Sequence, residues 1–308
     1  HYAGGISEVR DQVESANVVW DVVDLIESDM LRACDEGLLE PLDTIDLPPG
    51  KDGTPARDDF VEGSLHKCGV GMIVYATAFA YDNNAFRGKT PEKIADFFDT
   101  RHFPGPRAIR KDPAVIMEWA LIADGVAAKD VYKVLETKDG VRRALEVMDR
   151  IKPGLQVWNN GREPVRMLQN SEVVMSSVWA TTASVAANDL GSNFSIAWDG
   201  RVLEVELFAI PKGTRNKQAA IEFIKFGSST ESLARMASLH PNGPVRKSSL
   251  DMLSSEVLSK LPNNPAAGNL TTIRSDSVWW SRNHATLEEK FNRWLAQPVR
   301  KGAAGTVR

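Results

Sequence analysis

The sequence predicts an α/β protein with largely parallel sheets, and three observations support that prediction. Apolar segments with strand character alternate with amphipathic helical segments along the chain. A proline after an N-cap residue is typical of a helix start, and it occurs at Thr90-Pro91 and at Asp112-Pro113. The 308 residues suffice for two domains, yet no low-complexity linker or internal repeat interrupts them. We therefore expect that two lobes, if present, are joined by strands.

The predicted elements begin with a strand in "NVVWDVVDL" (17–25) and a helix in "MLRACDEGLL" (30–39) that ends near Gly37. The apolar stretch "GVGMIVYATAFAYD" (69–82) is too long for one simple strand and is typical of a chain that crosses between two lobes. Further elements are a strand that turns into a helix in "VVMSSVWATTASVAA" (173–187), two separate strands in "FSIAWDG" (194–200) and "EVELFAIP" (204–211), and a helix in "NKQAAIEFIKF" (216–226).

The composition excludes several classes of protein. Hydrophobic residues make up 43% and charged residues 25%, which is ordinary for a folded globular chain. The net charge of −4 gives no electrostatic footprint for nucleic acid. No run of about 18 apolar residues could span a membrane. The first ten residues, "HYAGGISEVR", lack the pattern of a signal peptide, so we expect a processed chain or a missing start.

No catalytic or metal-binding motif is found. The five histidines lack ligand spacing, and neither a G-x-S-x-G elbow nor a Walker loop occurs, so no cofactor and no metal site are expected. The two cysteines, Cys34 and Cys68, are compatible with two buried free thiols or with one disulfide. Such a bridge would close a loop of about 35 residues, stabilise the fold by roughly 3–4 kcal/mol and require an oxidising compartment.

Two pairs of side chains are candidate ligand contacts. Glu204 and Glu206 share one face of the strand in "LEVELFAIPKG", so they are either a solvated edge or acceptors for a positively charged group. Trp158 and Trp179 lie where strands give way to loops, the place where open α/β sheets bind ligands. Each indole either belongs to the core or attracts an organic cation. Such a cation–π interaction contributes roughly 1–2 kcal/mol when it is desolvated.

The order of these motifs resembles the extracellular solute-binding proteins of ABC importers, in particular the group for polyamines, GABA and opines. The resemblance covers about residues 20–297, and "AIPKG…NK.AA..FI.F" is its most diagnostic pattern. It implies a two-lobed type II periplasmic-binding-protein-like fold, each lobe a mostly parallel sheet flanked by helices, with a cleft that closes by hinge motion. The lobes implied are residues 1–76 plus 206–246, with the family's first strand and helix missing, and 77–205 plus 247–297, followed by a disordered tail at 298–308.

The function that this resemblance implies is binding without catalysis. The receptor captures a small amine-containing ligand, either a polyamine or a zwitterion such as GABA or an opine, and delivers it to the permease subunits in the membrane. We expect a monomer in the bacterial periplasm, exported with a signal peptide that has been cleaved. The periplasm is an oxidising compartment, which favours the Cys34–Cys68 disulfide.

The same resemblance implies which residues contact the ligand. Glu206 matches the acidic position before "AIP" and is expected to pair with an ammonium group, while Glu204 is either a second acceptor or solvent-facing. Trp179 matches the aromatic residue that packs on the ligand chain. Glu27 and Ser28 form the polar clamp after the first predicted strand. Tyr75 lies on the segment that offers aromatic residues in relatives, and Trp158 remains a candidate.

Arg110 is the expected basic pole. GABA-type relatives can carry Asn-Gly-Arg after the aromatic residue, and here Ala180-Thr181-Thr182 stands there instead. Arg110-Lys111, just before the predicted Asp112-Pro113 helix start, is either a solvated surface or an anion site strengthened by a helix N-terminus. An acidic pole and a basic pole together favour a zwitterion over a pure polyamine.

Two other classes of protein stay open. One is an enzyme on the same bilobal fold with Cys68 as nucleophile, although the sequence offers no base-and-orienter arrangement for it. The other is a ferric-ion receptor, which would need a tyrosine cluster. The four tyrosines include no adjacent pair, so we rank it last.

Overall fold

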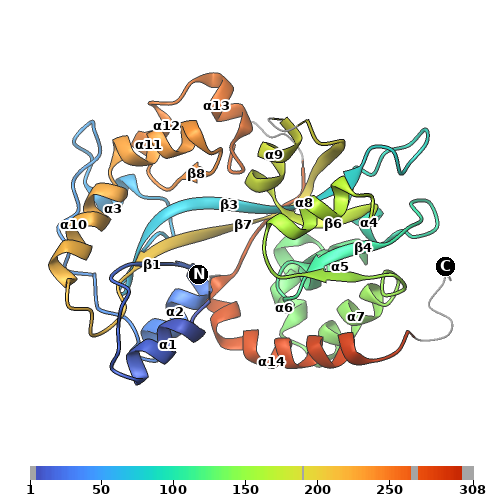
Figure 1. The fold of residues 1–308 in the computed structure, drawn as a ribbon, viewed down its shortest axis with the longest axis horizontal. Coiled ribbons are helices and arrows are strands. Elements are labelled where there is room, and N and C mark those ends of the chain that lie inside the picture. Colours follow the sequence, from blue (N-terminus) through green and yellow to red (C-terminus); the bar gives the residue numbers. More distant parts are fainter. Residues whose placement is uncertain (1–4, 189–190, 265–269, 300–308) are drawn as a thin grey trace. The chain divides into compact units, whose positions relative to one another are not determined.

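The computed structural model describes residues 5–188, 191–264 and 270–299 (Figure 1). The chain forms two compact units: unit 1 comprises residues 1–75, 203–268 and 276–282, and unit 2 comprises 76–202, 269–275 and 283–308. The expected boundaries differ from this division mainly in 247–268, which the structure groups with the first unit. Of the tail expected at 298–308, residues 300–308 lie outside the described residues.

Unit 1 takes its elements from three stretches of the chain. The long strands β3 (Gly69–Asp82) and β7 (Phe194–Ala209) both continue into unit 2, and so does α14 (Ser277–Ala296). Its other elements are α1 (Ser7–Glu14), β1 (Val23–Ile26), α2 (Glu27–Asp35), α3 (Ala56–Asp59), β2 (Leu65–His66), α10 (Lys217–Gly227), α11 (Thr230–Leu239), β8 (Gly243–Pro244), α12 (Lys247–Leu250) and α13 (Ser255–Lys260).

The sheet of unit 1 is antiparallel where its register is defined. β1 pairs with β7 from Val23 opposite Ala209 to Ile26 opposite Glu206, and β2 and β8 both pair with β3. The alternation expected for this strand is present over 204–207, where Leu207 is fully buried and Glu204 and Glu206 are half-buried, but Phe208, on the face of the glutamates, is buried as well. Leu207 joins a core that includes Leu25 and residues of α2, α10 and α11.

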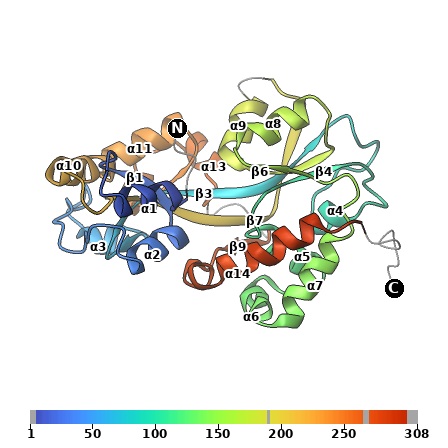
Figure 2. The ribbon, with the colours of Figure 1, turned by 60° about the horizontal axis from the view of Figure 1, so that its bottom comes forward.

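Unit 2 contains the remaining strands and the helices around them. These are α4 (Ile94–Phe98), β4 (Arg107–Arg110), α5 (Ile116–Ala123), a 3₁₀ turn (Ala128–Asp130), α6 (Val131–Leu135), α7 (Lys138–Met148), β5 (Gln156–Trp158), α8 (Arg162–Gln169), β6 (Met175–Trp179), α9 (Ala180–Asn188) and β9 (Thr272–Arg274). Figure 2 shows α14 running beside α7. The strands β5, β4, β6 and β3 lie next to one another in that order, and β9 pairs with β7.

The fold class is the mixed α/β class expected, with a difference in strand direction. β4 runs parallel to both β5 and β6, as the alternation of strands and helices predicts. β3, by contrast, pairs antiparallel with β6, β2 and β8, so "mostly parallel" is wrong for the sheet of unit 1. The two strands expected at 194–200 and 204–211 form one continuous strand, β7, which runs through Gly200 even though the φ of that glycine is +79°.

The Cys34–Cys68 pair forms a disulfide that joins α2 to the β2–β3 turn, with a sequence separation of 34. By the chain-entropy argument it stabilises unit 1 by about 2–4 kcal/mol. We expect the double variant Cys34→Ala/Cys68→Ala to lose that much unfolding free energy in urea titrations. Reductant should produce a similar loss in the natural chain and none in the variant. A loss in the variant that reductant still deepens would contradict this assignment.

No helix in the described part of the chain is both long and apolar enough to cross a membrane.

Candidate functional site

Three strands of unit 2 end at chemically distinctive residues. β4 ends at Arg110, β5 at Trp158 and β6 at Trp179. Because β4 is parallel to both of its neighbours, these ends meet at one edge of the sheet, and Arg110 lies opposite Trp158 in register. The carboxyl ends of strands in open α/β sheets are where such proteins bind ligands. We therefore take this edge as the first part of the candidate site.

Trp158 supports the site rather than presenting a face to a ligand. Its side chain is fully buried, and its Nε1–H donates to Ser177 Oγ at 3.2 Å. Ser177 Oγ also accepts the backbone N–H of Arg110 at 3.1 Å, so one hydroxyl fixes both strand ends. The expectation that Trp158 contacts ligand is corrected accordingly: its ring stands edge-on to Trp179, with centroids 5.6 Å apart and an interplanar angle of 89°.

Trp179 is half-buried and holds a cation. The Arg110 guanidinium lies 5.7 Å from the centre of the indole ring, within range of a cation–π contact. The ring also lies against Gly161, where a Cβ would sit only 2.3 Å from Trp179 Cε3. A larger side chain at position 161 would therefore displace the indole.

The segment that follows Arg110, the expected basic pole, does not start a helix where the sequence predicts one. α5 begins at Ile116 rather than at Pro113, so the helix start expected directly after Arg110-Lys111 lies three residues further along the chain. Asp112 instead accepts the Ala114 N–H at 2.8 Å and pairs with His284 Nε2 at 3.2 Å. Burial raises the pKa of Asp112, but the His284 hydrogen bond and the charge of Arg110 outweigh it and bring that pKa to about 2. Asp112 is thus an ionised neighbour of Arg110 at neutral pH.

A second arginine follows the glycine that contacts this indole. The tripeptide Asn160-Gly161-Arg162 follows Trp158, and Gly161 contacts Trp179. The Asn-Gly-Arg sequence that relatives can carry after the aromatic residue is therefore present here after Trp158, between β5 and α8, and β4 separates β5 from β6, the strand of Trp179. Arg162 is exposed and begins α8.

Unit 1 contributes a group of carboxylates around the end of β1. Glu27 follows β1 directly as the first residue of α2, with half-buried Ser28 next to it. The two carboxylate oxygens of Glu27 have different partners: His66 Nε2 at 3.0 Å, and the Ser277 hydroxyl, which donates at 2.9 Å. These contacts hold Glu27 in one orientation.

Two further carboxylates lie on β7 in the same unit. Glu206 is directly opposite Ile26, the residue before Glu27, and its side chain is half-buried. Glu204 Oε2 accepts the hydroxyl of buried Tyr75 at 2.8 Å. Oxygen acceptors on β1–α2 and β7 thus surround the end of β1, an arrangement that suits an ammonium group.

His66 provides a pH-dependent contact in this group. Its pKa is raised above the ordinary value, chiefly by the hydrogen bond to Glu27, which outweighs burial. A raised folded-state pKa stabilises the fold fully below the unfolded pKa of about 6.5, and this stability is lost as pH rises through the folded pKa. We expect His66→Gln to cost more stability at pH 5.5 than at pH 8.5 in urea titrations. An equal cost at both pH values, or a pH dependence that persists in Glu27→Gln, would contradict this.

Sequence reasoning missed His66, Ser277, Ser177 and Gly161. His66 and Ser277 meet Glu27 across 39 and 250 positions of sequence, so no local pattern could reveal them. Gly161 could have been found from the sequence, because it is the middle residue of an Asn-Gly-Arg tripeptide, the pattern that GABA-type relatives can carry.

No group of three or more His, Cys, Asp or Glu side chains is arranged to hold a metal ion among the residues described. The chain is a mixed α/β scaffold of two units. Unit 1 contains the carboxylate acceptors around the end of β1, and unit 2 contains the Arg110 guanidinium against the Trp179 ring.

The chain belongs to the bacterial extracellular solute-binding proteins, whose family profile matches residues 1–266. It is 38% identical over 297 residues to the gamma-aminobutyric acid-binding protein of Pseudomonas aeruginosa, covering 96% of this chain and 81% of that protein.

Solved structures agree with this assignment. The periplasmic binding protein MotA from A. tumefaciens B6, in complex with glucopine, superposes with a TM-score of 0.86 at 26% identity, covering 94% of this chain and 88% of MotA. A solved GABA receptor gives a TM-score of 0.80, also at 26% identity, covering 96% and 87%. These relatives are binding proteins and not enzymes, and the two-unit fold is theirs as well.

Proposed function

We propose that this chain is the receptor of an ABC importer for a small zwitterion, with GABA or a similar ω-amino acid as the first candidate. The observation that carries the proposal is the Arg110 guanidinium held over Trp179 at the strand ends of unit 2, because it supplies a fixed cation for a carboxylate. Support comes from the 38% identity to a GABA-binding protein and from the similarity to a GABA receptor.

Each end of the ligand has a proposed partner. Arg110 binds the carboxylate, and Trp179 packs on the aliphatic chain. Glu206 accepts the ammonium group, with Glu204 and Glu27 as further acceptors. Tyr75 and Ser28 complete the polar surroundings by orienting Glu204 and by offering a hydroxyl.

A zwitterion suits this charge distribution better than a diamine does. A second ammonium near Arg110 would be repelled, and the guanidinium would have no anionic ligand group to pair with. Leaving one buried charge unpaired costs several kcal/mol, which is ample for selectivity. A monocarboxylate without the amine would, in turn, leave the acceptors of unit 1 without the ligand's ammonium.

A thermal-shift panel tests the proposal. It comprises ω-amino acids of three to six carbons, putrescine, spermidine and opines. A ligand present at 100 times its Kd adds about 2.7 kcal/mol of stability, which raises Tm by several degrees. We expect the ω-amino acids to raise Tm and the polyamines not to. A rise with polyamines alone would contradict the proposal, as would no response to any zwitterion.

Capture by hinge closure is the second part of the proposal, followed by presentation of the loaded form to membrane permease subunits in the periplasm. We expect the radius of gyration measured by small-angle scattering to decrease on adding the zwitterion that gives the largest Tm shift. The sample should stay monomeric at all protein concentrations. An unchanged radius at saturating ligand would contradict closure while leaving the ligand assignment intact.

A further inference from the structure

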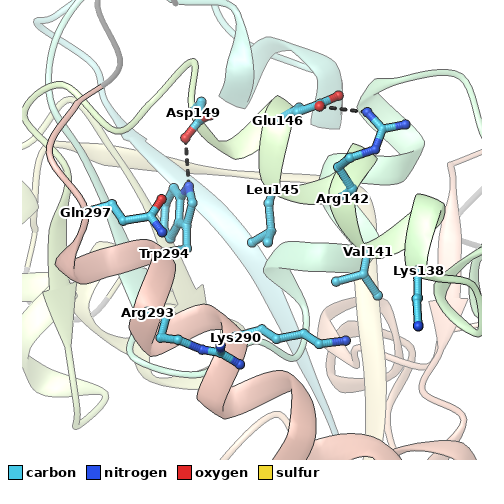
Figure 3. Close-up of a pocket in the computed structure, with 10 residues that line it drawn as sticks. All are labelled: Lys138, Val141, Arg142, Leu145, Glu146, Asp149, Lys290, Arg293, Trp294 and Gln297. Carbon is cyan, nitrogen blue, oxygen red and sulfur yellow. Dashed lines mark hydrogen bonds and ion pairs between the residues drawn. The ribbon is translucent and has the colours of Figure 1, made fainter.

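Unit 2 contains a groove that has no part in the candidate site described above. It lies between α7 and the part of α14 after residue 282, and its volume is about 520 Å³ (Figure 3). That volume falls within the range of roughly 300–1,000 Å³ typical of small-molecule sites. Neither Arg110 nor Trp179 lines it.

One wall of the groove is apolar and held in place. It consists of Val141 and Leu145 from α7 and of Trp294 from α14. The Trp294 Nε1–H donates to Asp149 Oδ1 at 2.7 Å, and Lys152 Nζ lies 4.6 Å from the ring centre. The indole is therefore fixed at its polar edge, and the apolar surface left open in the groove comes mainly from half-buried Leu145, with the edges of Val141 and Trp294 beside it.

The charged lining is biased toward cations. Arg142 pairs with Glu146 at 2.7 Å, so its charge is largely balanced. Lys138 and Lys290 differ, because neither has a carboxylate oxygen within 4.0 Å in the part of the chain that the structure describes. In Figure 3 the Lys290 side chain extends toward Val141 and Lys138, away from the Asp149 end of the groove.

We propose that this groove binds a small organic anion with an apolar body, such as an aryl or alkyl carboxylate. The carboxylate lies between Lys138 and Lys290, and the apolar body packs on Val141, Leu145 and Trp294. This second site is independent of the site for the transported solute.

Size and charge favour a small molecule over other occupants. Val141 and Trp294 are only 6% and 5% exposed, so the apolar wall offers little of the roughly 800 Å² per partner that a stable protein interface buries. The chain segment after residue 299 carries Arg300, Lys301 and Arg308, so its charge does not complement the groove.

The test uses 4-phenylbutyrate as the probe and the natural chain labelled with ¹⁵N-tryptophan. The Trp294 indole resonance is assigned by its absence in Trp294→Phe. We expect a saturable shift of that resonance with a submillimolar Kd, matched by isothermal titration calorimetry. 4-Phenylbutylamine, which has the same ring and chain but the opposite charge, should bind at least tenfold more weakly.

Surface variants provide the control for charge. Lys138→Gln/Lys290→Gln should weaken phenylbutyrate binding at least tenfold, and Lys133→Gln, on α6 and outside the groove, should leave it unchanged. Calorimetry on these variants needs no resonance assignment, so the test survives if Trp294→Phe folds poorly. No saturation below 10 mM would overturn the proposal, as would equal affinity for the amine or an unaffected lysine double variant. A concentration-dependent dimer that covers Trp294 would overturn it too.

Discussion

Arg110→Ala is expected to weaken binding of GABA by at least about 100-fold. The substitution removes the guanidinium that lies over Trp179, and it leaves the ligand carboxylate without a charged partner. Truncating one side of a buried, hydrogen-bonded charge pair typically costs about 2–5 kcal/mol. Isothermal titration calorimetry at constant ionic strength measures the loss directly.

Two neighbouring cations make this experiment specific. Lys111→Gln removes an exposed positive charge adjacent in sequence and should change the Kd less than threefold. Arg162→Gln removes the exposed arginine that follows Gly161, the glycine in contact with Trp179, and should have a smaller effect than Arg110→Ala. If Arg162→Gln abolishes binding while Arg110→Ala binds normally, the basic pole belongs to Arg162 and our assignment is wrong.

Asp59→Ala is expected to destabilise unit 1 by about 3–5 kcal/mol, the largest stability effect we anticipate from one substitution. Arg246 is completely buried and donates to Asp59 Oδ2 at 2.9 Å, to Ser228 O at 2.6 Å and to Pro48 O at 2.9 Å. Removing the carboxylate leaves a buried guanidinium with carbonyl partners alone. Urea titration followed by circular dichroism measures the cost.

The matched control is an exposed ion pair in the same unit. Arg10 and Glu36 are joined at 2.5 Å with side chains about one-third exposed, so Glu36→Gln should cost less than about 1 kcal/mol. Burial raises the pKa of Asp59, yet its hydrogen bonds to Ser248 and its pairing with Arg246 lower it overall. The Asp59 contribution should therefore be present at neutral pH and fade as pH falls below about 4. Similar costs for both variants at pH 7 would contradict this account.

Long-range features of the fold were predictable where chemistry restricts the alternatives. The apolar run 69–82 forms the single strand β3, so the prediction that it is too long for one simple strand is wrong, but β3 is shared by both units, as expected for a chain that crosses between two lobes. The disulfide followed from an expected oxidising compartment, with only two cysteines available to pair. The face shared by Glu204 and Glu206 followed from strand periodicity alone.

Other features depend on tertiary contacts that no local pattern encodes. Asp112-Pro113 has the local pattern of a helix start, but Asp112 pairs with His284 and the helix begins three residues after Pro113. Trp158 and Trp179 look alike in sequence, and only tertiary packing in the core of unit 2 buries the first completely while leaving the second half-buried. The strand direction in unit 1 could likewise not be predicted from the sequence, because alternating strands and helices predict parallel pairing.

Calorimetric titration of the natural chain with GABA, butyrate and butylamine most directly tests the claim that the ligand is recognised at both charged ends. The three compounds share a four-carbon chain and differ only in which ends are charged. Our account predicts that GABA binds at least 100-fold more tightly than either singly charged analogue. Butylamine or butyrate binding as tightly as GABA would show that one pole is not used, and would contradict the account.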